Sequence, residues 1–127
     1  MRKIMNLTQH IATPTQKEVG VFDLPDELRS ELKELHTWEN LPTRMEIAER
    51  IYHIKEFCEK LHAEFPDVRH AMIGGVPFMN WCWERELKYV DVIPMYAFSR
   101  RNTVETPQPD GTVKKTVVFE HLGFVTG

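Results

Sequence analysis

Two adjacent arginines follow a compact apolar stretch in the segment PMYAFSRRNTVE, positions 94–105. Arg100 and Arg101 each carry a planar guanidinium that can bind phosphate through two parallel hydrogen bonds, and the charge persists at any physiological pH. Ser99 and Asn102 flank the pair and add a hydroxyl and an amide. The segment predicts a buried strand that ends in a phosphate-binding group. The alternative is that adjacent arginines are simply solvated.

Two further polar clusters follow predicted strands. Thr8, Gln9 and His10 come after the first apolar segment, and Gly74 and Gly75 come after the third. Glycines let backbone amides approach an anion without an intervening Cβ, and a helix that begins just beyond them adds the positive end of its dipole. The alternative is an ordinary turn, because IGGVPF lacks both the Rossmann glycine spacing and the Walker A lysine.

Histidines are the candidates for proton transfer. His10 could act as acid or base near neutral pH, or it could be a hydrogen-bonded structural residue. His121, in FEHLGF, could lie on an edge strand or could close the pocket. His53 and His62 lie in a long predicted helix without the i, i+4 spacing of a zinc pair, so we expect neither a metal site nor a cofactor.

Strand and helix signals alternate along the chain and indicate what must position these residues. Capping boxes at Thr13 and Thr43 predict two helix starts. We expect strands over 4–8, 21–23, 68–73 and 92–98, and helices over 14–19, 27–35, 44–65 and 77–89. Because proline donates no hydrogen bond to a sheet, Pro94 suggests that the last of these strands becomes regular only at Met95.

The C-terminal region has a different pattern. Asp110 and Gly111 form a strong hairpin-turn signal between possible strands at 103–107 and 113–118, with more strand over 119–125. Glu105 and Lys114 are expected to face each other across this hairpin. Strand–helix–strand order requires crossover connections, so the sequence predicts a three-layer α/β sandwich with a mainly parallel sheet, in a single domain over 1–127.

In such a sheet, ligands bind beyond the carboxyl ends of the parallel strands. We therefore expect the three polar clusters to lie together at one edge. Bound anions must be held locally, because a net charge of −3 argues against a surface that binds duplex nucleic acid by bulk electrostatics.

Composition also limits the environment of the chain. Its 42% hydrophobic and 28% charged residues are typical of a globular protein. We expect no signal peptide, no membrane span and two reduced cysteines, Cys58 and Cys82, in a cytoplasmic protein. The helix over 77–89 carries an apolar surface that either packs on the sheet or covers a second subunit, so a homodimer is expected; this surface comprises Phe78, Met79, Trp81 and Trp83.

Four segments together resemble a family of small, uncharacterised proteins from phages and prophages of Gram-positive bacteria. They are NLTQHIATPTQ, MIGGVPF, YAFSRRNTVE and PDGTVKKTVVFEHLGFV, and they span most of the chain. More distantly, the C-terminal pattern is similar to small CRISPR-associated proteins of the ring-nuclease type. That similarity rests on Pro94, Tyr96, Ala97, Arg100 or Arg101, Val104, Glu105, Asp110, Gly111, Phe119 and His121.

The ring-nuclease resemblance implies a Rossmann-like fold related to CARF domains. It also implies a dimer that binds cyclic oligoadenylate across its two-fold axis and cleaves it without metal, in the host cytoplasm. The sequence departs from that pattern at Ala97-Phe98-Ser99, where such relatives often carry threonines, and this bears on catalysis more than on fold. Three functions therefore stay open: nucleotide-signal binding with turnover, binding without turnover, and a phage accessory protein that has no small-molecule ligand.

Overall fold

The computed structural model describes residues 2–127 as an α/β fold with a five-stranded sheet in the order β2-β1-β3-β4-β5. The first four strands run parallel and the last is antiparallel to β4. The strands are β1 (Ile4–Asn6), β2 (Val21–Asp23), β3 (His70–Met72), β4 (Ile93–Pro107) and β5 (Val113–Thr126). The predicted fold class, a mainly parallel sheet with a C-terminal hairpin, is confirmed.

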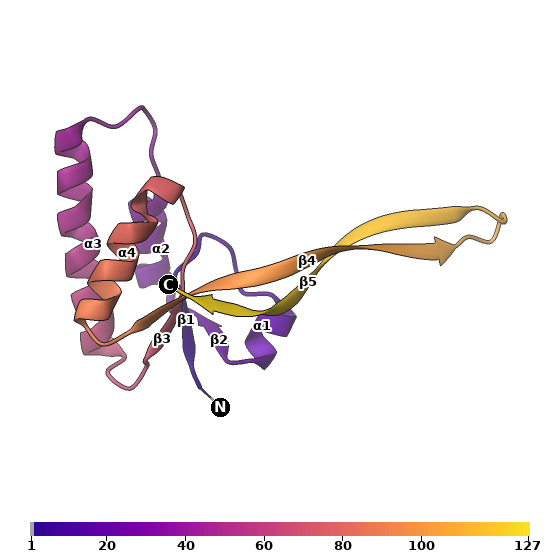
Figure 1. The fold of residues 1–127 in the computed structure, drawn as a ribbon, viewed down its shortest axis with the longest axis horizontal. Coiled ribbons are helices and arrows are strands. Elements are labelled where there is room, and N and C mark those ends of the chain that lie inside the picture. The colour runs from indigo at the N-terminus through magenta and orange to yellow at the C-terminus, as the bar shows by residue number, and fades with distance from the viewer. Residues whose placement is uncertain (1) are drawn as a thin grey trace.

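The helices are α1 (Pro14–Glu18), α2 (Asp26–His36), α3 (Arg44–Glu64) and α4 (Pro77–Tyr89). Both predicted capping boxes are present, since the Thr13 and Thr43 hydroxyls accept hydrogen bonds from the amides of Gln16 and Glu46. In Figure 1, α2, α3 and α4 lie together on one side of the sheet and the short α1 lies on the other. No helix within residues 2–127 is long and apolar enough to cross a membrane.

Most of the core lies between the sheet and the three longer helices. Ile54, Phe57 and Leu61 of α3 are buried there with Trp83 and Leu87 of α4. Cys58 and Cys82 are buried in the same cluster as free thiols. A smaller cluster covers the opposite face and comprises Ile4, Ala12, Val21, Met72 and Met95, with Phe124 packed against it.

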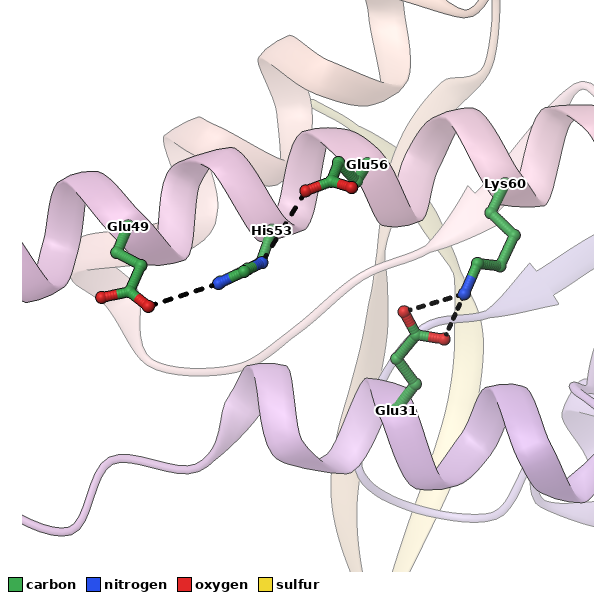
Figure 2. A network of polar contacts seen from close by, with 5 residues as sticks. All are labelled: Glu31, Glu49, His53, Glu56 and Lys60. Carbon is green, nitrogen blue, oxygen red and sulfur yellow. Dashed lines mark hydrogen bonds and ion pairs between the residues drawn. The ribbon is translucent and has the colours of Figure 1, made fainter.

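Exposed polar contacts connect the outer surfaces of α2 and α3. Figure 2 shows the Lys60 ammonium beside the Glu31 carboxylate, 2.8 Å from its nearer oxygen, and His53 between two carboxylates of its own helix. Because all these side chains are solvent-exposed, salt screens the contacts and they add little to stability. The packing of α2 on α3 therefore depends on buried leucines, which Leu28, Leu32 and Leu35 supply as their spacing predicts.

The largest departure from expectation is the length of the last two strands. β4 does not end at Phe98: it continues to Pro107, and β5 pairs with it along that whole length, with a register irregularity between Phe98 and Ser99. Residues 99–121 therefore leave the body as a two-stranded ribbon, which we call the arm (Figure 1). Phe98 is exposed, so the buried part of β4 is shorter than predicted.

Two smaller predictions were wrong. β4 begins at Ile93 and includes the buried Pro94. Hydrogen bonds from the amides of Ile93 and Ile73 join β4 to the segment of β3, so this pairing needs no N–H from Pro94. The position of that missing N–H is on the other side of the strand, toward the end of β5. Glu105 pairs with Lys115 and not with Lys114, a register one residue from that expected. The packing expected for the helix over 77–89 is confirmed for Met79 and Trp83, which are buried in the core, whereas Phe78 and Trp81 are exposed.

Candidate functional site

Two of the three predicted polar clusters border one open pocket of about 800 Å³ at the carboxyl ends of β1 and β3. Thr8, Gln9 and His10 line one side, and Gly74 and Gly75 line the other. The pocket is completed by the start of α1, the start of α4 and the β4 residues Tyr96 and Ala97; the remaining lining residues are Ile11, Thr13, Gln16, Met72, Ile73, Val76 and Pro77. The sheet edge thus gathers segments far apart in the sequence.

The loop after β1 is held by Asn6, a buried residue that the sequence reasoning did not single out. Its amide nitrogen donates to the Asp23 carboxylate at 2.8 Å and to the His10 carbonyl at 2.7 Å. Its carbonyl oxygen accepts from the Thr8 hydroxyl at 2.7 Å and from the Thr8 amide at 3.0 Å. Every hydrogen-bonding group of the Asn6 side chain is therefore used to fix the turn that carries the candidate residues.

Asp23 anchors the same loop from the end of β2. Burial alone would raise the pKa of this carboxyl, but hydrogen bonds from Asn6 and the Ala12 amide, together with the charges of Lys17 and Arg29, lower it. Asp23 therefore stays ionised and accepts bonds from two segments of the loop. The only sequence signal for the contact between Asn6 and Asp23 was that each is a polar residue at the end of a predicted strand.

Thr8 has a restricted role because of this network. Its hydroxyl hydrogen is directed at Asn6, so the Thr8 oxygen can accept a hydrogen bond from a ligand but cannot donate one to phosphate. Gln9 donates one amide hydrogen to the His36 carbonyl at 3.3 Å and keeps its second hydrogen for the pocket. Among the residues of this loop, Gln9 is the better candidate to contact an anion.

Gly75 has a packing reason that the sequence does not show. A Cβ at this position would lie 2.7 Å from Nδ1 of the buried His36, closer than real Cβ atoms come to any neighbour. Nε2 of His36 donates to the Leu7 carbonyl at 2.7 Å, and the ring stacks on Trp83 at 5.3 Å between centroids. At Gly74 a Cβ would make an ordinary contact of 3.6 Å with Thr8. Only the second glycine is sterically required.

The electrostatic environment of His36 follows from the same packing. Burial lowers the pKa of its imidazole, the hydrogen bond to the Leu7 carbonyl opposes that change, and the positive charge of Arg50 adds to it. His36 is therefore neutral at physiological pH with its proton on Nε2. It supports the floor of the pocket without contributing charge.

Backbone amides supply the anion-binding capacity of the pocket. Val76 precedes α4 without a side-chain cap, and Pro77 occupies the first turn. Within residues 2–127, the amides of Gly74 and Gly75 have no acceptor in the chain and lie beside the positive end of the α4 dipole. This arrangement can hold a phosphate or carboxylate oxygen.

The third predicted cluster lies elsewhere. Ser99, Arg100, Arg101 and Asn102 are on the arm and are not among the residues that line the pocket. Arg100 pairs with Glu120 at 2.9 Å, and the Asn102 amide donates to the same carboxylate. Their position follows from the pairing with β5. Because β5 stays paired with β4 beyond Phe98, the chain continues as a strand past the sheet edge and does not turn at Ser99 toward the pocket.

The two candidate histidines differ in placement. His10 is exposed and lines the pocket. His121 lies at the base of the arm opposite Ser99 and packs its ring against Phe124 at 4.8 Å, and its buried Nδ1 has no hydrogen-bond partner within the described residues 2–127. It does not line the pocket. Across residues 2–127, His, Cys, Asp and Glu side chains form no group of three that could hold a metal ion.

Tyr96 is a further pocket residue, which the sequence reasoning placed in a strand and in the ring-nuclease resemblance but not in the candidate site. Its hydroxyl donates to the Glu84 carboxylate at 2.7 Å. Burial raises the pKa of the phenol, and the hydrogen bond to Glu84 and its negative charge raise it further. The hydroxyl is therefore protonated throughout the physiological range, and its oxygen can accept from a ligand.

A family model with the description "Uncharacterized protein MJ1673 family" matches residues 2–125. No curated protein and no solved structure matches. Since the match spans nearly every residue, including both sides of the pocket and the arm, the chain belongs to the MJ1673 family.

Proposed function

We propose that the protein binds a nucleotide signal at the carboxyl edge of its sheet. The observation that carries this proposal is the pocket between Thr8–His10 and Gly74–Gly75, where free backbone amides and the start of α4 face uncharged polar side chains. Amides at a helix start suit a phosphate, and the Gln and Thr side chains opposite suit a ribose or a base.

The charge distribution favours a ligand larger than a mononucleotide. The pocket lining contains no lysine or arginine, whereas Arg100 lies three residues beyond the lining residue Ala97. At about 3.3 Å per strand residue, that separation is about 10 Å. A cyclic oligoadenylate, with several phosphates around its ring, could contact the pocket amides and one of the arginines at the base of the arm together.

The resemblance to small ring-nuclease-type proteins supports the same ligand class. The finer assignment, a protein of phage or prophage origin that acts on a defence signal in the host cytoplasm, rests on that resemblance. Ser99 and Asn102 would contribute to binding only through such an extended ligand, because both lie on the arm.

Turnover would need no metal. The ribose 2′-oxygen attacks the adjacent phosphorus in line, its proton passes to a base, and the departing 5′-oxygen takes a proton from an acid, which leaves a 2′,3′-cyclic phosphate. His10 is the proton carrier best placed for this, since it lines the pocket. Arg100 or Arg101, which lie on opposite faces of the arm, would stabilise the developing charge according to the face that the ligand contacts, and His121 would act only on a ligand that reaches the base of the arm.

A thermal-shift screen tests binding. Linear and cyclic oligoadenylates are compared with mononucleotides, and a ligand at a hundred times its Kd should stabilise the protein by about 2.7 kcal/mol. His10→Ala and Arg101→Ala should reduce the shift, while Arg44→Ala, an exposed change at the start of α3, should not. If no nucleotide shifts the melting temperature, the proposed function is wrong; if Arg100→Ala and Arg101→Ala both keep the full shift, the arm is not part of the site.

Incubation with labelled cyclic tetra- and hexa-adenylate separates binding from cleavage. Linear product formed equally with and without EDTA would support turnover, and its loss in His10→Ala would identify the proton carrier. Binding without any product after long exposure would leave a sensor or a protein that sequesters the signal.

The alternative function is an interaction protein without a small-molecule ligand. The arm favours it, because large apolar side chains are exposed along a ribbon that projects from the body (Figure 1). An absence of ligand shifts together with a stable protein complex through the arm would favour this alternative.

A further inference from the structure

The arm is an unusual amount of exposed sheet for a chain of this size. Nine residue pairs, from Ser99–His121 to Pro107–Val113, extend it beyond the body. Isolated two-stranded ribbons are at best marginally stable in water. Large apolar side chains are nevertheless exposed along it: Val104, Val113, Val117, Val118 and Phe119, the last at 71%. An exposed apolar surface of this kind is typical of an interaction site, and the order of the residue pairs along the arm indicates the kind of partner.

Side chains alternate between the two faces of the ribbon, so each face can be read from the pairing. One face, which we call the Val117 face, has the cross-strand pairs Arg101–Phe119, Thr103–Val117 and Glu105–Lys115 in succession. Two contacts confirm the assignment: the Arg101 guanidinium lies 5.7 Å from the Phe119 ring centre, and Lys115 lies 3.9 Å from Glu105. The central pair, Thr103–Val117, is uncharged.

The opposite face is less available. Arg100 and Asn102 both bind the Glu120 carboxylate there, so its basal charges are already paired within the arm. On the Val117 face, by contrast, Arg101 faces an aromatic ring and has no carboxylate partner among residues 2–127, and the Glu105–Lys115 contact is long and exposed.

We propose that the Val117 face packs against the same face of a second copy of this chain, with the two arms antiparallel about a two-fold axis at the Thr103–Val117 pair. Such an axis lays each strand over the same strand of the second copy, running in the opposite direction. A residue two positions before the centre of its strand therefore meets the partner's residue two positions after that centre. Arg101 then meets the partner's Glu105, Phe119 meets the partner's Lys115, and Val117 meets its own equivalent.

This self-complementarity is the reason to choose a second copy over another protein. Each cation of the face would find a carboxylate or an aromatic ring on the identical surface, and the uncharged pair at the centre would be buried. A nine-pair ribbon measures roughly 30 by 10 Å, so the two faces alone bury roughly 600 Å² in total, which is below a standard specific interface and in the range of weak, transient contacts. We therefore expect a reversible dimer whose population depends on concentration. The inference does not depend on the proposed function.

Sedimentation equilibrium over a wide concentration range tests the state of the full chain. The wild type should rise from the 15.0 kDa chain mass to twice that value. Val117→Lys places two like charges at the axis and should weaken dimerisation by about a hundredfold. Val118→Lys, the same change on the opposite face of the arm, is the matched control and should dimerise as the wild type does. Circular dichroism verifies that each variant is folded.

A charge-reversal pair tests the register. In a dimer of Arg101→Glu, each new carboxylate at position 101 would face the partner's Glu105. In a dimer of Glu105→Arg, each new guanidinium at position 105 would face the partner's Arg101. Like charges then repel at both contacts, so each variant alone should be largely monomeric. Mixed in equal amounts, the two variants restore both ion pairs in a heterodimer, which should form with near wild-type affinity. A wild type that stays monomeric at every concentration, a dimer unaffected by Val117→Lys, or a mixture that stays monomeric would each overturn the proposal.

Discussion

Replacing Gly75 with alanine tests how the floor of the pocket is built. The new Cβ would lie 2.7 Å from Nδ1 and 3.0 Å from Cε1 of His36. The ring cannot move away easily, because Nε2 is bonded to the Leu7 carbonyl and one ring face is stacked on Trp83. Either the loop shifts away from His36 or the imidazole gives up its hydrogen bond.

The expected loss in the free energy of unfolding follows from those two outcomes. Forcing an extra methyl group into a packed site costs about 1–3 kcal/mol, and losing the buried hydrogen bond adds about 0.5–1.5 kcal/mol. We expect Gly75→Ala to lower the free energy of unfolding by about 2–4 kcal/mol, which in a chain of this length is a fall in Tm of about 8–15 °C.

Gly74→Ala is the matched control. Its Cβ would make an ordinary contact, and neither glycine has a positive φ, so the change should be neutral or should stabilise by up to about 1 kcal/mol through the unfolded chain. Urea unfolding followed by circular dichroism measures both. In a His36→Ala background the cost of Gly75→Ala should largely disappear. Equal stabilities of the two glycine variants would refute the reasoning.

Three further predictions concern buried groups. The folded state lowers the pKa of His36, so the unfolded chain binds a proton near pH 6.5 that the folded chain does not. The free energy of unfolding should therefore fall as pH drops below about 6.5, and should fall less steeply in His36→Asn. Urea titrations at several pH values measure this. Asn6→Ala leaves several bonding groups unpaired and should cost about 2–4 kcal/mol in the same assay, with a smaller ligand shift if the pocket binds nucleotide. Burial raises the pKa of Cys82 to about 11 and that of Cys58 further, so a thiol reagent at pH 8 should label neither in the native protein and both after unfolding.

Local sequence signals were sufficient for most of the elements. The capping boxes at Thr13 and Thr43 and the spacing of Leu28, Leu32 and Leu35 are properties of short segments, and the helices they predict are present. Element order then gave the parallel sheet, because crossover connections between successive strands leave few alternatives. The meeting of Thr8–His10 with Gly74–Gly75 at one sheet edge followed from this topology.

Pairing along the last two strands was beyond local signals. A serine and two arginines after an apolar stretch are equally compatible with a strand end and with one exposed section of a longer ribbon, and only the register with β5 decides between them. Side-chain contacts across the fold had the same status: that His36 requires Gly75, or that Asn6 reaches Asp23, depends on residues far apart in sequence.

The sequence by itself therefore determined the class of fold, the helix boundaries and the edge of the sheet at which polar residues gather, since these depend on periodicity, capping and connection length. Tertiary structure alone decided that the arginines leave the pocket for an arm, which glycine is sterically required and which charges are already paired. Those outcomes depend on strand register and on distances between non-local side chains, and neither is encoded in any short segment.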